Sequence, residues 1–244
     1  MTTSSRIALI LMGSAALTAG ANAASTTVAG FDGGSNDGFM GNAFFEATGG
    51  NPGGVAHTPD LIEFPSLRTG GVGEPANPGF LGDYSSFSSV TFGVDAKTVS
   101  MLDFIGNQTS RPLGVALINR NITGTDGPAG VYFQLGNLSV FENPDWTSYS
   151  VTIDDPTSTT LPSGWIGFGS TNSSFAPELP AGTTFADILA GVTEFQISGA
   201  VPGFFFGPVF PNYYLDNISV TVPAPGAAAP MLGLIGLLGS RRRR

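Results

Sequence analysis

The chain has 244 residues, with 9 basic and 18 acidic side chains and no cysteine. Residues 24–222 keep four of the basic residues and all of the acidic ones, a formal charge of −14, which repels phosphate backbones and excludes nucleic acid as a partner. Glycine (35 residues) and proline (18 residues) are abundant and charged residues are only 11%, so a helix bundle and a charge-driven disordered chain are both disfavoured.

The first 23 residues have the pattern of a secretory signal peptide. Arg6 supplies a positive charge, residues 7–17 are apolar, and Ala21-Asn22-Ala23 fits the small-x-small cleavage pattern. A membrane anchor is the alternative, but this apolar stretch is short for a hydrocarbon core of about 30 Å. We therefore expect export and cleavage after Ala23. Without disulfides, the exported body must be stabilised by its core or by a metal.

Short segments of alternating polarity recur through residues 24–222, without a linker or an internal repeat. One apolar and one polar face are typical of antiparallel strands packed in two layers, and turn signals separate the segments. The predicted fold is an all-β antiparallel sandwich. The apolar faces are Val90-Phe92-Val94, Leu113-Val115-Leu117, Val131-Phe133-Leu135, Tyr149-Val151-Ile153, Ile166-Phe168, Phe195-Ile197 and Ile218-Val220-Val222.

One segment predicts a short helix. Thr184 is a plausible N-cap, and Asp187 three residues later completes a variant of the capping box. Apolar residues then recur at helical spacing until Gly191. We expect one or two turns packed over an edge of the sandwich.

Several motifs occur in a characteristic order, and the chain resembles bacterial laminin-B-like (laminin IV-like) domains over about residues 30–222. The resemblance implies a jelly-roll sandwich of the galactose-binding-like type. The sequence departs from the pattern at Phe39, Phe44 and Phe45, where tryptophans are usual, and at Ser85-Ser86-Phe87, which replaces a Tyr-Gly-Gly run. The motifs are Gly49-Gly50-Asn51-Pro52-Gly53-Gly54, Phe80-Leu81-Gly82-Asp83-Tyr84, Trp146 with Tyr149, residues 185–197, and Leu215-Asp216-Asn217-Ile218-Ser219-Val220.

The sequence offers little for catalysis, and we expect a protein that is not an enzyme. The single histidine, His57, excludes a site with several histidines, and no nucleophile elbow or cysteine nucleophile is present. Glycoside hydrolysis requires two converging carboxylates. The adjacent Asp154 and Asp155 are a poor pair, because neighbours on a strand point to opposite faces. A secreted glycoside hydrolase remains the alternative, discriminated by whether two carboxylates converge in one cleft.

A structural calcium ion is the one cofactor that the residues favour. Asp216 lies two and four residues before Ile218 and Val220, so its carboxylate is expected on the same, core-facing side of the last strand. A cation there would neutralise the charge of the carboxylate. In similar jelly rolls a calcium ion often bridges the first and last strands, and Asp32 and Asp216 are the positions that match. The alternative is that Asp216 accepts backbone N–H groups at the strand end.

The aromatic segment 204–214 is the candidate ligand-binding segment. Its glycine and prolines predict a loop, and exposed aromatic rings stack on sugars or anchor proteins. The alternative is that these rings fold back and cap the core. The candidate residues are Phe204, Phe205, Phe206, Phe210, Tyr213 and Tyr214.

The C-terminal end has three parts in a fixed order. The extended motif Val222-Pro223-Ala224-Pro225 precedes an apolar run, residues 226–240, that would form a transmembrane helix of about 22 Å. Four arginines follow, Arg241, Arg242, Arg243 and Arg244, and would hold the C-terminus on the cytoplasmic side. This is the arrangement of a transient anchor that a processing enzyme removes.

This tail resembles the PEP-CTERM sorting signal of Gram-negative bacteria, with Ala224 at the position where glutamate is usual. The resemblance implies transit through the inner membrane, processing by an exosortase-type enzyme, and delivery to the cell surface or the extracellular matrix. The predicted organisation is a signal peptide (1–23), a jelly-roll domain (24–222) and a sorting tail (223–244). The predicted function is a structural or carbohydrate-binding module whose partner is a polysaccharide. A protein-binding adhesin is the remaining alternative.

Overall fold

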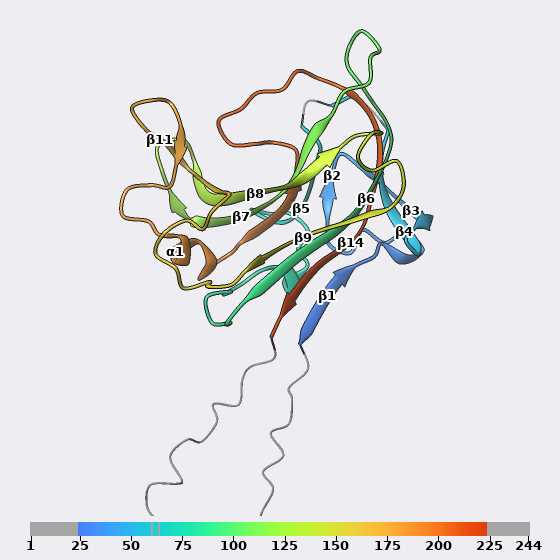
Figure 1. Cartoon of the computed structure of the whole chain (residues 1–244). Coiled ribbons are helices and arrows are strands. Elements are labelled where there is room, and N and C mark those ends of the chain that lie inside the picture. The colour runs from blue at the N-terminus through green and yellow to red at the C-terminus, as the bar shows by residue number, and fades with distance from the viewer. Residues whose placement is uncertain (1–23, 60, 63, 224–244) are drawn as a thin grey trace, which may run out of the picture.

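The computed structural model describes residues 24–59, 61–62 and 64–223, and these form one sandwich of two antiparallel sheets (Figure 1). Sheet A has the order β3-β4-β14-β6-β9, with β1 also paired to β14. Its strands are β1 (Ser25–Ala29), β3 (Phe44–Gly50), β4 (Gly53–Thr58), β6 (Val90–Leu102), β9 (Thr147–Ile153) and β14 (Phe210–Val222). The predicted all-β fold class is confirmed.

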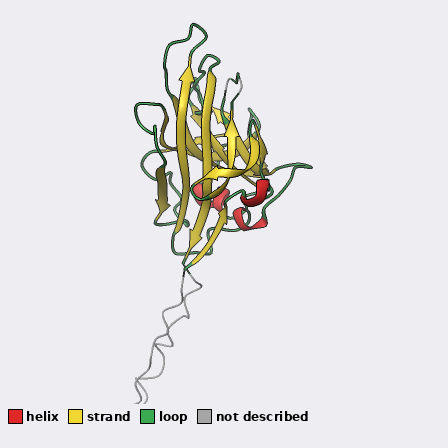
Figure 2. Cartoon of the chain, turned by 90° about the vertical axis from the view of Figure 1, so that its right-hand side faces the viewer, coloured by secondary structure: helices red, strands yellow, loops and turns green. Residues whose placement is uncertain are grey.

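Sheet B has the order β10-β8-β7-β13-β5-β2, and a small separate hairpin, β11-β12, follows its edge strand β10. Its strands are β2 (Met40–Gly41), β5 (Ser66–Gly70), β7 (Arg111–Thr123), β8 (Pro128–Leu138), β10 (Trp165–Phe168) and β13 (Glu194–Ser198). The hairpin consists of β11 (Ser170–Thr171) and β12 (Pro177–Glu178). The helical turns, red in Figure 2, lie in the lower half of the sandwich and pack against different strands. They are η1 (Asp32–Gly34), η2 (Pro78–Phe80) and α1 (Phe185–Leu189).

The core between the sheets is built on phenylalanine. Phe195 of β13 packs against Phe39, Phe80 and Phe92, with ring centroids 5.1–6.2 Å apart, and all four rings are fully buried. Aromatic pairs at these distances stabilise a fold beyond the effect of the apolar area that they bury. Because Phe92 belongs to sheet A and Phe195 to sheet B, the cluster holds the two sheets together without a disulfide. Trp165 packs on Phe185 and is also nearly buried.

The predicted helix is confirmed with its cap. Thr184 Oγ1 accepts a hydrogen bond from the backbone N–H of Asp187 at 3.2 Å, and Asp187 Oδ2 accepts one from the N–H of Thr184 at 2.8 Å. The hydrogen bonds from Thr184 hold the pKa of Asp187 below its ordinary value. These two bonds satisfy donors at the helix start that have no partner within the helix.

The alternation in β10 runs opposite to the prediction. Trp165 and Gly167 are buried toward the core, whereas Ile166 and Phe168 lie on the outer face of sheet B. Both faces of this short strand carry large apolar residues, so periodicity alone could not choose between them. The outer face is apolar here because it lines a pocket.

A bulge in β14 changes the predicted position of Asp216. Leu215 and Ile218 both belong to the core, and Asn217 between them has a φ of 49°, so the two-residue period is interrupted. Asp216 pairs directly with Asp95 on β6, an outer-face position of sheet A. It is nevertheless fully buried, since the turn between β3 and β4 covers it.

The first and last strands leave the sandwich at the same end, because Ser25 pairs with Val222 (Figure 1). Of the predicted sorting motif, Val222 and Pro223 are described, and Val222 ends β14. The signal peptide, Ala224, Pro225, the apolar run and the arginine cluster lie outside the described residues. Within the described part of the chain no helix has the length and apolar character needed to cross a membrane.

Candidate functional site

The outer face of sheet B carries a row of side chains at right angles to its strands. Because Phe195 and Ile197 face the core, Gln196 between them faces outward. The strand register then fixes its neighbours on the same face. The row is Arg68 of β5, Gln196 of β13, Ala116 of β7, Tyr132 of β8 and Ile166 of β10.

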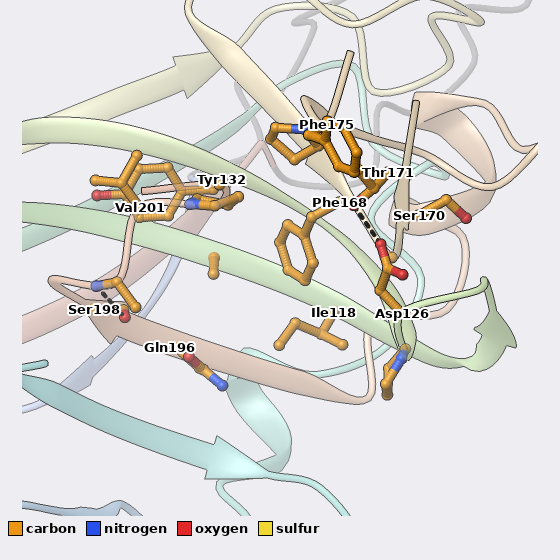
Figure 3. Close-up of a pocket in the computed structure, with 17 residues that line it drawn as sticks. Ile118, Asp126, Tyr132, Phe168, Ser170, Thr171, Phe175, Gln196, Ser198 and Val201 are labelled. Atoms are coloured by element: carbon orange, nitrogen blue, oxygen red, sulfur yellow. Dashed lines mark hydrogen bonds between the residues drawn. The ribbon is translucent and has the colours of Figure 1, made fainter. Parts of the chain in front are cut away.

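This row crosses a pocket of about 510 Å³, which we call the outer-face pocket (Figure 3). From β7, Ala116 and Ile118 line the floor of the pocket, and the short side chain of Ala116 leaves space there. The ring of Tyr132 lies across Gly114, where any Cβ atom would overlap it. The loop 200–203 and the β11-β12 hairpin form the walls. Such a mostly apolar pocket with a few polar groups suits a small molecule or one unit of a polymer.

Tyr132 brings an unsatisfied polar group to the outer-face pocket. The side chain is only 1% exposed, and its hydroxyl has no hydrogen-bond partner within the described residues. Burial raises the pKa of Tyr132 above its ordinary value, so the hydroxyl keeps its proton at neutral pH. A buried donor without a partner is costly in a folded protein, and a ligand in the open pocket reaches this hydroxyl only if the side chains that cover it move.

Phe175 stands at the rim of the pocket on the β11-β12 turn. Its side chain is 87% exposed, and its φ of 60° lies in the left-handed region that bulky residues avoid. Asn172 fixes this conformation, because its Oδ1 accepts hydrogen bonds from the N–H groups of Ser174 and Ala176 at 2.9 and 3.0 Å. Backbone strain of about 1–3 kcal/mol persists where the surroundings impose it, and such sites are often functional.

The hairpin that carries Phe175 is fastened to the sheet. Thr171 Oγ1 donates a hydrogen bond of 2.5 Å to Asp126 Oδ2, and the N–H of Asp126 donates to the carbonyl of Gly169 at 3.0 Å (Figure 3). These bonds fix the backbone that carries Phe175 beside the pocket. Preorganisation of this kind reduces the entropic cost of binding.

The charges beside the pocket are paired with one another. Arg120 Nε donates to Glu194 Oε2 at 2.5 Å, and Glu194 also accepts from Gln196 Nε2 at 2.5 Å. On the neighbouring strand, Arg68 pairs with Glu74 at 3.4 Å. Asp126 in the pocket lining is the exception, since within the described residues it accepts hydrogen bonds from threonine hydroxyls and forms no ion pair. The face therefore suits an uncharged ligand with hydroxyl groups better than an anion.

The predicted aromatic segment is divided by the structure. Residues 210–214 belong to β14 and not to a loop, and Tyr213 is buried in the core, which makes it unavailable to a ligand. Tyr214 stacks on His57 on the outer face of sheet A, with ring centroids 4.3 Å apart. The prolines suggested a loop, but Pro211 is accommodated where the β14 register shifts. Phe204, Phe205 and Phe210 are exposed, and Phe206 is half-buried.

Phe175 and Tyr132 were not among the predicted site residues, although the sequence contains a signal for each of them. Phe175 is a lone aromatic residue in the polar turn Asn172-Ser173-Ser174-Phe175, and Tyr132 alternates with core residues and so must face outward. No sequence signal showed that the chain carries these two residues to the same pocket.

The two predicted calcium ligands are in different environments. Asp32 is exposed and its Oδ1 accepts from the N–H of Gly54 at 3.3 Å. Asp216 is fully buried and accepts from the N–H groups of Asn51 at 2.5 Å and Asn217 at 2.7 Å. Burial raises the pKa of Asp216, and the nearby charges of Asp95 and Asp32 raise it further. The backbone bonds agree with the alternative reading of Asp216.

A calcium ion between Asp32 and Asp216 stays a prediction. The described residues contain no group of three or more His, Cys, Asp or Glu side chains that could hold a metal ion, so backbone carbonyls and water would have to supply most ligands. If the ion binds, calcium raises the thermal midpoint over that in chelator, by the equivalent of about 2.7 kcal/mol at 100 times its dissociation constant. Asp216→Asn should abolish the difference. An unchanged midpoint in verified metal-free protein contradicts the prediction.

The remaining titratable candidates have structural partners. His57 lies between Glu46 Oε1, 2.7 Å from Nδ1, and Asn212 Oδ1, 3.1 Å from Nε2. Asp154 and Asp155 both line a second cavity of about 420 Å³, beside Trp165 and Phe133. Asp155 Oδ1 accepts from the N–H of Thr157 at 3.0 Å and from its hydroxyl at 2.6 Å, which commits this oxygen to the local turn.

Neither the protein-family models nor the curated proteins include a match to this chain. Among solved structures, it is similar to an exo-beta-agarase at 14% identity, covering 82% of this chain and 26% of that one, with a TM-score of 0.45. It is also similar to the CBM22-1–GH10 modules of Clostridium thermocellum xylanase 10B (11% identity, 81% and 28% covered, TM-score 0.42). A carbohydrate-binding module specific for non-crystalline cellulose, CBM28, has 12% identity, with 79% and 88% covered and a TM-score of 0.27. The chain thus spans about a quarter of the length of each of the two enzyme chains.

Proposed function

We propose that this chain is an exported, non-catalytic module that binds a neutral glycan in the outer-face pocket of sheet B. The observation that carries the proposal is Phe175, an exposed ring held in a strained conformation at the pocket rim. An exposed aromatic face stacks on the apolar face of a sugar ring. The ring of Tyr132 lines the same pocket, and its buried hydroxyl has no partner in the described residues, so a shift of the covering side chains on binding would let a sugar hydroxyl complete that bond.

The proposal includes delivery of the module outside the cell. The signal-like N-terminus and the PEP-CTERM-like tail support export, passage through the inner membrane and processing by an exosortase-type enzyme. A glycan-binding module that reaches the surface would attach there to a polysaccharide of the cell surface or matrix. Mass spectrometry of the mature protein from its own host tests this part, since both cleavage points must appear. Full-length protein in the cytosol would contradict it.

The test of binding is Phe175→Gly. Glycine adopts the left-handed conformation without strain, so this variant should fold with a thermal midpoint equal to or above that of wild type. Loss of the ring should weaken binding to the neutral polysaccharide by about 30-fold, the effect of removing a contact worth about 2 kcal/mol. Affinity electrophoresis against soluble xylan, agarose fragments and β-glucan, followed by calorimetry, measures the change.

Two variants make this test specific. Phe104→Ala removes a ring that is 75% exposed in the β6-β7 connection, outside the pocket lining, and it should leave binding unchanged. Phe175→Trp keeps an aromatic face and should retain binding. The proposal is wrong if none of the neutral polysaccharides binds, or if the Phe104 and Phe175 variants lose binding equally.

A secreted glycoside hydrolase remains the second candidate, since Asp154 and Asp155 line one cavity. Hydrolysis requires one carboxyl to donate a proton while the other attacks or activates water. Release of reducing ends from a polysaccharide that the protein binds, abolished by Asp154→Asn, would establish the enzyme. Binding without release of reducing ends supports the non-catalytic module.

A further inference from the structure

The loop 199–209 connects the outer-face pocket to a second exposed ring. Val201, Pro202 and Gly203 line the pocket, and Phe204 follows them directly with 61% of its surface exposed. Gly203 also lies against Pro177 of the β11-β12 hairpin, where an added Cβ would stand 2.6 Å from the proline Cδ. The pocket wall therefore runs from the hairpin of Phe175 to Gly203, and Phe204 is the next residue along the chain.

Phe204 is held in place by its own loop. Its ring packs on Phe206 with centroids 4.7 Å apart, and the guanidinium of Arg111 lies 5.5 Å from the centroid of Phe206. Arg111 is only 8% exposed and donates a hydrogen bond of 2.6 Å to the carbonyl of Gly207. Arg111 thus contacts two consecutive residues of the loop, the ring of Phe206 and the carbonyl of Gly207. These contacts restrain the loop that carries the exposed ring of Phe204.

The two exposed rings are within reach of one flexible ligand. Phe175 is two residues from Pro177, and Phe204 is the neighbour of Gly203, which touches Pro177. With about 3.6 Å per extended residue plus one side-chain contact, the Cα atoms of Phe175 and Phe204 are at most about 20 Å apart. A single sugar unit stacks on one ring, whereas an extended chain of units can contact both.

We propose that Phe204 is a second stacking platform, so that the outer-face pocket takes an extended glycan chain and not a single sugar or a short end group. This inference rests on the proposed function. The pocket holds the chain at Phe175, and the loop 199–209 guides its next units onto Phe204. The ligand class is accordingly a linear neutral polysaccharide, with several consecutive units bound at once.

The experiment measures affinity against chain length. Xylo-, cello- and agaro-oligosaccharides of two to eight units are titrated into wild-type protein by calorimetry, using the series that matches the polysaccharide bound. We expect the affinity of wild type to rise with length and then level off. Phe204→Ala should lower that plateau about tenfold and leave the affinity for the shortest ligand unchanged. Phe175→Gly should lower the affinity at every length, and Phe104→Ala at none.

Each outcome decides one proposal. If wild type binds short and long oligosaccharides equally, or if Phe204→Ala weakens all lengths alike, the second platform is wrong while the proposed function stands. If no neutral glycan binds, the proposed function fails and this inference fails with it. Circular dichroism of each variant shows that the fold is kept, because Phe204 is largely exposed and its truncation leaves the core intact.

Discussion

Gly54→Ala is expected to lower the free energy of unfolding by about 3 kcal/mol, near the upper end of the usual cost of overpacking. Gly54 is buried in β4, and a Cβ atom there would overlap the carbonyl group of Phe31. The obstacle is backbone, so no side-chain rotation can relieve it. The chain around η1 would have to move away from β4, and the bond from the N–H of Gly54 to Asp32 Oδ1 would be lost.

Denaturant unfolding of Gly54→Ala and Gly207→Ala measures this effect against a matched control. Gly207 has no atom within 4 Å of an added Cβ, and its φ lies outside the left-handed region. Its substitution should change stability by no more than about 0.5 kcal/mol. Equal stability of the two variants would show that β4 and the segment at Phe31 are not in contact as described.

The same region shows why the N-terminal third of the fold could not be read from the sequence. Strands β3 and β4 end and begin in glycine, at Gly50 and Gly53, and most side chains of β3 are exposed. Without a buried face β3 has no two-residue period to detect, and β4 has none because successive residues of it are buried. The later strands were predictable because each buries one face against the phenylalanine core.

Ile166, Phe168 and Asp216 were assigned to the wrong face because the two strands that carry them violate the assumptions of the alternation pattern. Alternation assumes one dry face and an uninterrupted strand, but β10 is apolar on both faces and β14 contains a bulge at Asn217. A bulge shifts every later residue to the other face, and nothing in the residue types around Asp216 announced it. The capping box at Thr184 succeeded because its two bonds depend only on residues three positions apart.

The candidate site was less predictable than the fold, because it depends on contacts between distant segments. The aromatic content of the sequence pointed to residues 204–214, of which Phe204 adjoins the pocket and Tyr213 lies in the core. Phe175 reaches the pocket only because its hairpin is fastened to Asp126, 49 positions earlier in the chain. Exposure of a ring is set by such packing, and composition does not encode it.

Gly114→Ala is expected to reduce glycan binding by more than tenfold and to cost about 1–3 kcal/mol of stability. The added methyl group would overlap the ring of Tyr132, which lies across Gly114. The ring must then turn away from Gly114 and into the outer-face pocket. There it would fill the space in which the ligand is proposed to bind, and it would move the hydroxyl that has no hydrogen-bond partner. Calorimetry and thermal unfolding of the same preparation measure the two effects.

A matched control separates binding from stability. Gly136 of β8 lies beneath Tyr149 in the same way, with an added Cβ 2.5 Å from Cε1 of the ring, but neither residue lines the pocket. Gly136→Ala should therefore lose a similar amount of stability and keep wild-type affinity. Equal loss of binding in both variants would mean that general loosening of β8, and not the shape of the pocket, governs the affinity.

A double-mutant cycle with Tyr132→Ala tests the contact itself. Once the ring is removed, the methyl group of Gly114→Ala has room, so its cost in stability should nearly vanish and the two substitutions should couple by about 1–2 kcal/mol. Additive effects would place the ring of Tyr132 away from Gly114. The predicted loss of binding in Gly114→Ala would then lose its basis, since it depends on this one ring lying against a residue without a side chain.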